Sequence, residues 1–328
     1  MYKGFYNLKL NPFEITPDPS FLFATRKHNE ALGALYYGVR RRKGFVVITG
    51  EVGTGKTLLV RCLLEVLNRA NVAYAYVFNP CLTPTEFLEY IVGDFRLPTA
   101  GKSKSELLLN LGTYLIGRHH ENRTTVLVVD EAHHLSSELL EEVRLLTNLE
   151  TPQAKLLQIL LVGQPELDGK LDSSDLRQLK QRIAMRSRLT ALDFDETRGY
   201  VYCRLHVAGH KNPAEIFPSE TIVEVHRHSR GIPRLINTIC ENALIHGYAA
   251  QCRTIMPAII QEIATDFRLN IVHPPFNTQS GVDGHSAEVE RAAKTLLELY
   301  ASLHKQSEFE PDLQVAVSAG ARKNEPYI

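Results

Sequence analysis

The most constraining feature of this sequence is a glycine-rich octet between two apolar segments. The octet reads Gly50-Glu51-Val52-Gly53-Thr54-Gly55-Lys56-Thr57. It follows the apolar run 45–48, which is typical of a buried strand, and precedes the helical pattern 58–64. A strand that ends in glycines lets the backbone wrap an anion, and the next helix directs its free N–H groups and positive dipole end at the same point. The octet therefore predicts a phosphate-binding loop, whereas an ordinary glycine-rich turn leaves Lys56 unexplained.

The octet also predicts how a nucleotide would be held. We expect the backbone of 50–57, together with Leu58, to surround the phosphates, with Lys56 reaching the β- and γ-phosphates. The Thr57 hydroxyl is expected to bind Mg²⁺, because a hard cation that keeps several waters needs only one or two protein oxygens besides the phosphates. The predicted cofactors are thus ATP and Mg²⁺.

A second motif, Asp130-Glu131, follows the strand pattern 124–129. The four branched apolar residues at 126–129 indicate a strand buried on both faces, in the middle of a parallel sheet. The carboxyl ends of parallel strands meet at one edge, so we expect the two acids to face the octet. Asp130 would bind the Mg²⁺, directly or through water, and Glu131 would polarise the water that attacks the γ-phosphate. The alternative is that both acids cap the following helix.

Further polar residues are candidates for nucleotide sites. Gln164 follows another buried apolar run and is predicted to contact the γ-phosphate or the attacking water, or else to be a turn residue. Arg182, with Arg186 as second choice, lies near the last strand; a planar guanidinium there can enter a neighbouring subunit's site and stabilise charge on the leaving phosphates. Arg234 is predicted to bind the γ-phosphate from the C-terminal helices, or else to form a salt bridge among them.

The composition limits the class of protein. With 328 residues and 44% hydrophobic content, the chain can bury a sizeable core and is long enough for two units. The formal net charge is zero and the pI is about 7.2. Contact with nucleic acid would therefore need a local patch, such as the basic run 40–43, which is otherwise a solvated helix end. Five cysteines without a CxxC pair indicate reduced thiols, as in a cytoplasmic protein.

No sequence pattern predicts export or membrane insertion. Residues 1–5 lack the basic-then-apolar profile of a signal peptide, and no window approaches the roughly 18 uninterrupted apolar residues of a membrane span. We expect a cytoplasmic protein that reaches the inner membrane, if at all, through its partners.

The order of strand and helix patterns predicts four segments. Residues 1–44 read as a strap rich in aromatics and prolines, followed by a first helix; the strap is expected either to cover the adenine or to be purely structural. Strands that alternate with helices over 45–193 predict a three-layer P-loop α/β domain with a parallel five-stranded sheet. Residues 194–269 read as an all-α lid domain of four helices, and 270–328 as a linker, a single helix and a mobile tail.

The last strand and the histidine pairs lead to two further predictions. The stretch 168–185 reads as one helix, and 187–192 reads as the last strand. The histidine pairs 119–120 and 133–134 suggest a metal site, but no third and fourth ligands stand at closing spacing and adjacent histidines are expected to diverge. We therefore predict no metal at either pair.

Taken together, the motifs resemble the AAA+ ATPases, and more narrowly the ATPase module of the general secretion pathway protein A group, including relatives from exosortase-associated exopolysaccharide loci. The resemblance covers about residues 2–268. It rests on matches that include Asn11-Pro12-Phe13, His28-Asn29-Glu30-Ala31-Leu32, Gly50 to Thr57, Asp130-Glu131-Ala132-His133, Gly163-Gln164-Pro165-Glu166-Leu167 and Gly231-Ile232-Pro233-Arg234-Leu235-Ile236-Asn237.

The resemblance implies roles and partners. The implied Walker A, Walker B, sensor 1 and sensor 2 residues are Lys56 and Thr57, Asp130 and Glu131, Gln164, and Arg234. It also implies a homo-oligomer that forms around nucleotide and drives or times assembly of an envelope secretion or polysaccharide-export system. Secretion members continue into a membrane span and a peptidoglycan-binding part, where this sequence has a polar linker and one helix. Similar modules regulate DNA transposition, so an ATP-dependent DNA-binding regulator is the alternative; a nucleotide-held scaffold is a third.

Overall fold

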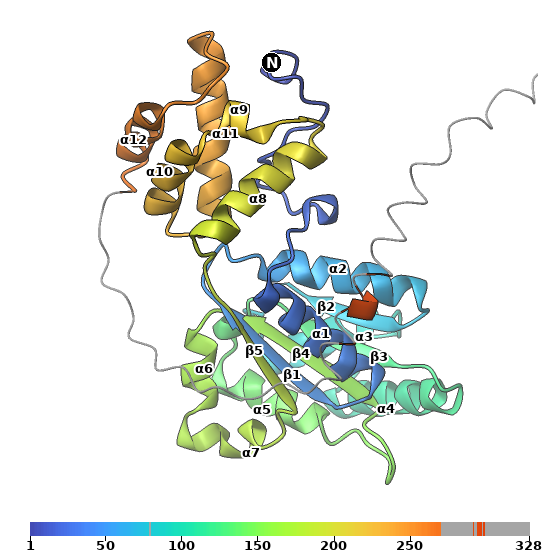
Figure 1. Ribbon diagram of the computed structural model, residues 1–328. Helices are drawn as coiled ribbons and strands as arrows, with labels where there is room; N and C mark the ends of the chain where they lie inside the picture. Colours follow the sequence, from blue (N-terminus) through green and yellow to red (C-terminus); the bar gives the residue numbers. More distant parts are fainter. Residues whose placement is uncertain (79, 270–290, 292–293, 297, 299–328) are drawn as a thin grey trace, which may run out of the picture.

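The computed structural model describes residues 1–78, 80–269, 291, 294–296 and 298. Figure 1 shows a sheet covered by helices and, next to it, a separate bundle of helices. The N-terminal segment runs alongside the bundle before the chain enters the sheet domain. The predicted linker and tail, and most of the predicted single helix within 270–328, lie outside the described residues.

The sheet has five parallel strands among the described residues, as predicted, in the order β2-β3-β4-β1-β5. Their bounds are β1 (Phe45–Gly50), β2 (Ala73–Val77), β3 (Thr125–Val129), β4 (Leu157–Gly163) and β5 (Met185–Leu189). Because all the pairs are parallel, the residues after β1, β3 and β4 emerge at one edge of the sheet. Strand β4 lies between β1 and β3, so Gln164 emerges between the glycine-rich octet and Asp130.

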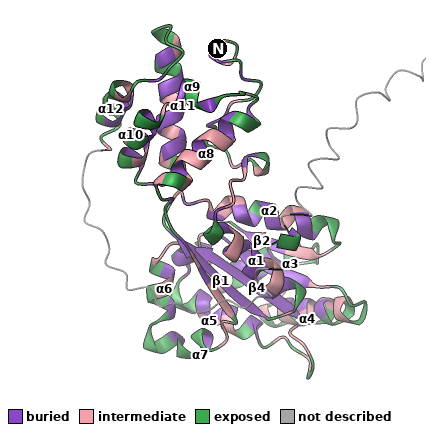
Figure 2. Ribbon diagram, in the orientation of Figure 1, coloured by how far each residue is buried: buried purple, intermediate pink, exposed green. Residues whose placement is uncertain are grey.

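Helices cover both faces of the sheet, which gives the predicted three layers (Figure 2). The helices are α1 (Arg26–Arg40) and α2 (Lys56–Arg69) on one face, and α3 (Pro84–Asp94), α4 (Lys104–His120) and α5 (Ser137–Leu146) on the other. Successive strand residues alternate between two cores: Val46 and Ile48 pack with α1 and α2, whereas Phe45 and Val47 pack with α3 to α5. Burial on both sides explains why the strands read as continuous apolar runs.

The prediction of one helix over 168–185 is wrong. The chain forms α6 (Glu166–Leu171), the 3₁₀ turn η3 (Ser174–Leu176) and α7 (Arg177–Lys180). The break lies at Ser173, whose backbone is extended with φ −63° and ψ 152°. Strand β5 runs from Met185 to Leu189, earlier than the predicted 187–192. Its pairing with β1 already begins at Met185, which lies opposite Val46.

The lid consists of helices over residues 194–266. They are α8 (Phe194–Val207), α9 (Pro213–Ile216), α10 (Ser219–Ser229), α11 (Pro233–Ala249) and α12 (Pro257–Asp266). Four of them match predicted helices, and α9 is a single turn that the pattern did not predict. The N-terminal strap completes the lid core: Tyr6 and Phe13 are buried there, and the Phe13 and Phe217 rings meet edge to face at 6.0 Å. The strap ends at the 3₁₀ turn η1 (Pro19–Phe21), beside the sheet domain.

Candidate functional site

A cavity of about 480 Å³ lies at the carboxyl edge of the sheet, between the sheet domain, the lid and the strap. Its volume is in the range of small-molecule and cofactor sites, roughly 300–1,000 Å³. The walls comprise strap residues 14–18, octet residues 52–57 with Leu58, the side chains after β3 and β4, and the start of α11. Glu131, Gln164 and Arg234 all line it. The strap therefore lies at the cavity and also packs in the lid core.

The octet has the backbone geometry of an anion cradle. Gly53 and Gly55 have φ values of 81° and 98°, in the left-handed region that favours glycine. Helix α2 begins at Lys56 without a side-chain cap, so its first N–H groups are left for an anion. A Cβ atom on Gly53 would lie 2.7 Å from Arg234 Cβ. Arg234 of the lid is therefore so close to the loop that a larger residue at position 53 would clash with it.

Lys56 is held inside the loop. Its Nζ donates to the carbonyl oxygens of Gly50, at 2.7 Å, and Glu51, at 3.0 Å. Burial lowers the pKa of Lys56, and the carboxylates of Glu131 and Asp130 oppose that shift. Gly50 and Glu51 thus contribute carbonyl oxygens behind the loop, while residues 52–57 form the cavity wall.

Asp130 is the acceptor for two hydroxyl groups. Its Oδ2 lies 3.2 Å from Thr57 Oγ1 and 2.9 Å from the hydroxyl of Tyr76, which stands on β2. Its Oδ1 accepts the backbone N–H of Glu131 at 2.9 Å. A hydroxyl beside a buried carboxylate is a hard oxygen donor set, so Thr57 and Asp130 fit Mg²⁺.

Glu131 is placed by an unusual backbone. Its φ of 51° and ψ of 35° lie in the left-handed region, which is rare for a residue other than glycine. The following 3₁₀ turn η2 (Ala132–His134) has no side-chain cap from Glu131, and α5 is capped by Ser136. The alternative that Glu131 merely caps the next helix is therefore wrong. Its side chain is 41% exposed and borders the cavity.

Gln164 and Glu131 share a neighbour, His133. The side-chain nitrogen of Gln164 is 2.9 Å from His133 Nε2, and the backbone N–H of Gln164 donates to His133 Nδ1 at 3.3 Å. The expectation that adjacent histidines diverge is wrong here, because the His133 and His134 rings lie 4.0 Å apart. A carboxylate oxygen of Glu131 is a third candidate ligand atom, within 4.8 Å of one on each histidine. Because both ring nitrogens of His133 already have partners, this group carries no argument for a metal.

Arg234 connects the lid to the octet. Its backbone N–H donates to the carbonyl oxygen of Gly53 at 3.2 Å, and the residue lines the cavity at the first turn of α11. That helix has Pro233 at its first position and no side-chain cap, so its positive end also points at this region.

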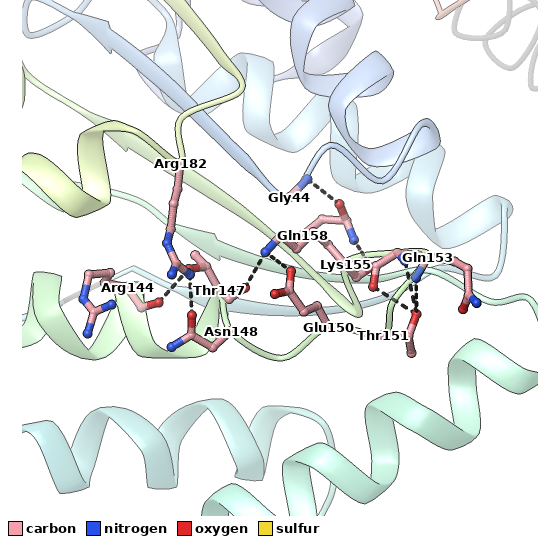
Figure 3. Close-up of polar contacts among 11 residues, drawn as sticks. Gly44, Arg144, Thr147, Asn148, Glu150, Thr151, Gln153, Lys155, Gln158 and Arg182 are labelled. Carbon is pink, nitrogen blue, oxygen red and sulfur yellow. Dashed lines mark hydrogen bonds and ion pairs between the residues drawn. The ribbon is translucent and has the colours of Figure 1, made fainter.

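Arg182 lies away from the cavity. It sits between α7 and β5, at the amino edge of the sheet, and donates to the Thr147 hydroxyl and the Asn148 side-chain oxygen (Figure 3). In the same region Gln158 accepts the Gly44 backbone N–H at 2.8 Å. The second choice, Arg186, pairs with Asp168 at 3.5 Å. Arg182 does not line the cavity of its own chain.

A family model described as "AAA domain" matches residues 39–171, which contain the octet and Asp130-Glu131. Residues 39–171 are therefore similar to AAA domains. The chain as a whole is similar to General secretion pathway protein A of Aeromonas hydrophila, with 45% identity over 250 residues, which are 76% of this chain and 45% of that protein. The chain thus spans less than half the length of this relative.

Solved structures share the fold of this chain. The Aeropyrum pernix ORC2 protein, in ADPNP–ADP complexes, matches with a TM-score of 0.59 and 16% identity, over 78% of this chain and 71% of that one. Cdc6p from Pyrobaculum aerophilum matches with a TM-score of 0.57 and 15% identity, over 88% and 89%. At such identities the likeness establishes the fold alone, a P-loop AAA+ architecture. Nucleotide binding follows from that architecture and the family match.

In the described part of the chain, no helix has the length and apolar character needed to cross a bilayer.

Sequence reasoning missed three residues of this site. His28, at the start of α1, is buried; its Nε2 donates to the Thr54 carbonyl oxygen at 3.0 Å, and burial lowers its pKa. Tyr76 binds Asp130, and His133 contacts Gln164. Tyr76 had a usable signal, since it is polar and stands at the end of the strand next to β3. His28 and His133 stand in stretches on which the resemblance rests, but no local pattern predicted their contacts, because these join distant segments.

Proposed function

We propose that this protein is a Mg²⁺-dependent ATPase that hydrolyses ATP to ADP and phosphate. The observation that carries the proposal is the convergence of Lys56, the Thr57–Asp130 pair, Glu131 and Gln164 on one nucleotide-sized cavity. A phosphate cradle alone needs only the octet, whereas a carboxylate that borders the same cavity supplies the base for an attacking water.

Each residue then has a distinct task. Lys56 leaves its loop carbonyls to contact the β- and γ-phosphates, and the octet N–H groups hold the remaining oxygens. Glu131 accepts a proton from the attacking water, and Gln164 contacts the γ-phosphate. Arg234 contacts the same phosphate from the lid, so nucleotide couples residues 194–269 to the sheet domain. Bound between Thr57 and Asp130, Mg²⁺ would neutralise phosphate charge.

We further propose that the active form is a homo-oligomer in which Arg182 serves the site of a neighbouring subunit. Its place at the amino edge of β5, outside its own cavity, supports action in trans. Its planar guanidinium would stabilise charge on the leaving phosphates, an effect absent from an isolated subunit.

The biological role we propose is to drive or time the assembly of an envelope secretion or polysaccharide-export system. The similarity to General secretion pathway protein A supports it. The protein would act in the cytoplasm and meet the inner membrane through its partners. Strongly salt-dependent binding of duplex DNA, with stimulated ATPase activity, would instead favour a DNA-binding regulator, because counterion release accompanies true DNA binding.

Glu131→Gln tests the hydrolytic role. The variant keeps the shape of the side chain and loses its basicity, so it should bind ATP as the wild type does and lose turnover. Glu138→Gln, an exposed position on α5, is the matched control and should leave turnover unchanged. Phosphate release and binding of a fluorescent ATP analogue would be measured together. Wild-type turnover in Glu131→Gln would remove this residue from the mechanism.

A further inference from the structure

The ring of His133 touches both residues that the proposed function puts at the γ-phosphate. The residue lies on η2, between β3 and α5, and is 8% exposed. Its Nε2 faces the Gln164 side chain at 2.9 Å, and its Nδ1 faces the Gln164 backbone nitrogen at 3.3 Å. The same Nδ1 is 3.4 Å from Glu131 Oε2. One imidazole therefore links the proposed base to the proposed phosphate contact.

The ring cannot satisfy all of these contacts at once, because a neutral imidazole has one donor and one acceptor nitrogen. With the proton on Nε2, Nδ1 accepts the backbone N–H of Gln164, and Nε2–H donates to the side-chain oxygen of Gln164. The amide is turned to match, since its oxygen and nitrogen exchange places by a simple flip. The NH₂ group of Gln164 then faces the cavity, and Glu131 has no hydrogen bond from the ring.

With the proton on Nδ1, every partner changes. Nδ1–H donates to Glu131 Oε2, and Nε2 accepts from the NH₂ group of Gln164. Gln164 then turns its carbonyl oxygen to the cavity, where it would repel a phosphate oxygen. Glu131 is then held by a hydrogen bond from the ring, which occupies one of its carboxylate oxygens. The two tautomers of His133 thus correspond to opposite states of both neighbours.

We propose that His133 is a positioning residue that couples the orientation of the Gln164 amide to the availability of Glu131 as a base. The inference rests on the proposed function. Phosphate oxygens only accept hydrogen bonds, so a bound γ-phosphate selects the tautomer with the proton on Nε2, and that tautomer frees Glu131. Glu131 therefore becomes available as a base only when a γ-phosphate is bound. It stays held by the ring when the cavity contains a nucleotide without that phosphate.

The surroundings of the ring keep it neutral and in place. Burial lowers the pKa of His133, and the nearby His134 and Lys56 lower it further. The negative charges of Glu131 and Glu166 oppose this shift without reversing it. The backbone is also fixed, because Lys170 Nζ donates to the His133 and Leu135 carbonyl oxygens. The change between the two states is therefore an exchange of tautomers in a fixed ring.

The test is a double-mutant cycle in which His133→Phe is made in the wild type and in Gln164→Ala. Phe keeps the ring shape and removes both nitrogens, so turnover should fall roughly 10- to 100-fold, the usual cost of losing a group that orients a reactive residue. Affinity for a non-hydrolysable ATP analogue should change little, which separates positioning from folding.

In a Gln164→Ala background, His133→Phe should have little further effect, since the coupled partner is gone. His133→Gln, which returns a polar group near Nε2, should recover part of the turnover. His120→Phe, at an exposed position on α4, is the control and should keep wild-type turnover.

Two results would overturn the coupling. One is wild-type turnover in His133→Phe; the other is a cycle in which the His133 and Gln164 effects multiply independently. Melting temperatures identify a variant that has lost its fold, and His133→Gln then carries the comparison. If Glu131→Gln is inactive while His133→Phe is normal, the coupling fails and the proposed function stands. If Glu131→Gln keeps wild-type turnover, the proposed function itself fails.

Discussion

Thr57 Oγ1 donates a hydrogen bond to Asp130 Oδ2 at 3.2 Å, which joins the first turn of α2 to the end of β3. The two residues are 73 positions apart in sequence and meet because β1 and β3 flank β4 in the same parallel sheet. The same carboxylate oxygen also accepts the Tyr76 hydroxyl at 2.9 Å. Asp130 is thus oriented from two sides before any ligand arrives.

Tyr76→Phe should weaken the response to Mg²⁺. The change removes one hydroxyl that orients Asp130, and loss of such an outer partner typically costs roughly 10-fold or more in metal affinity or activity. We expect a higher Mg²⁺ concentration for half-maximal ATPase activity, measured by titration at saturating ATP. Tyr74→Phe is the control, since that hydroxyl accepts from Asn68 instead. Equal Mg²⁺ titration curves for Tyr76→Phe and wild type would contradict the orienting role.

Gly231→Ala should loosen the attachment of the lid. Gly231 has φ 72°, and an added Cβ would lie 1.9 Å from the carbonyl oxygen of Leu192, whose N–H donates to the Gly231 carbonyl oxygen at 2.8 Å. Backbone strain alone costs about 1–3 kcal/mol. We expect a lower melting temperature and weaker nucleotide binding. Gly117→Ala, in α4 with open space around it, should be neutral or slightly stabilising by contrast.

Mixing inactive variants should restore activity if Arg182 acts in trans. Arg182→Ala keeps Glu131, and Glu131→Gln keeps Arg182, so a mixed oligomer contains complete sites at some interfaces. We expect each variant to be nearly inactive alone and their mixture to hydrolyse ATP, with specific activity that rises with protein concentration. Arg177→Ala, exposed in the same region, is the control and should be active. An inactive mixture of stable, nucleotide-binding variants would refute a role in trans.

Stability should fall below neutral pH in a manner that depends on His28. Burial lowers the pKa of His28 from its ordinary value near 6.5, so the unfolded chain binds a proton more readily than the folded one. The stability contribution is complete above the unfolded pKa and is lost as pH falls from about 6.5 toward the folded pKa. Thermal unfolding between pH 5 and 8 measures it. His28→Gln should flatten this dependence, whereas His120→Gln, at an exposed position, should not.

Local pattern was sufficient to predict the phosphate loop, Asp130-Glu131 and the parallel sheet. The octet is contiguous, and a strand buried on both faces must read as an apolar run, so β3 and β4 are visible before their partners are known. The same reasoning failed over 168–185, where a single extended residue, Ser173, divides a stretch of helical composition.

The tertiary structure alone decided which groups surround the loop. His28 reaches Thr54 across 26 residues, His133 reaches Gln164 across 31, and Tyr76 reaches Asp130 across 54. These contacts depend on strand order and on the left-handed turn at Glu131. Burial of a strand or a helix face leaves a periodic pattern in a sequence, whereas side-chain hydrogen bonds do not. The sequence therefore determined the sheet and its phosphate loop. Only the packed chain determined the site around them.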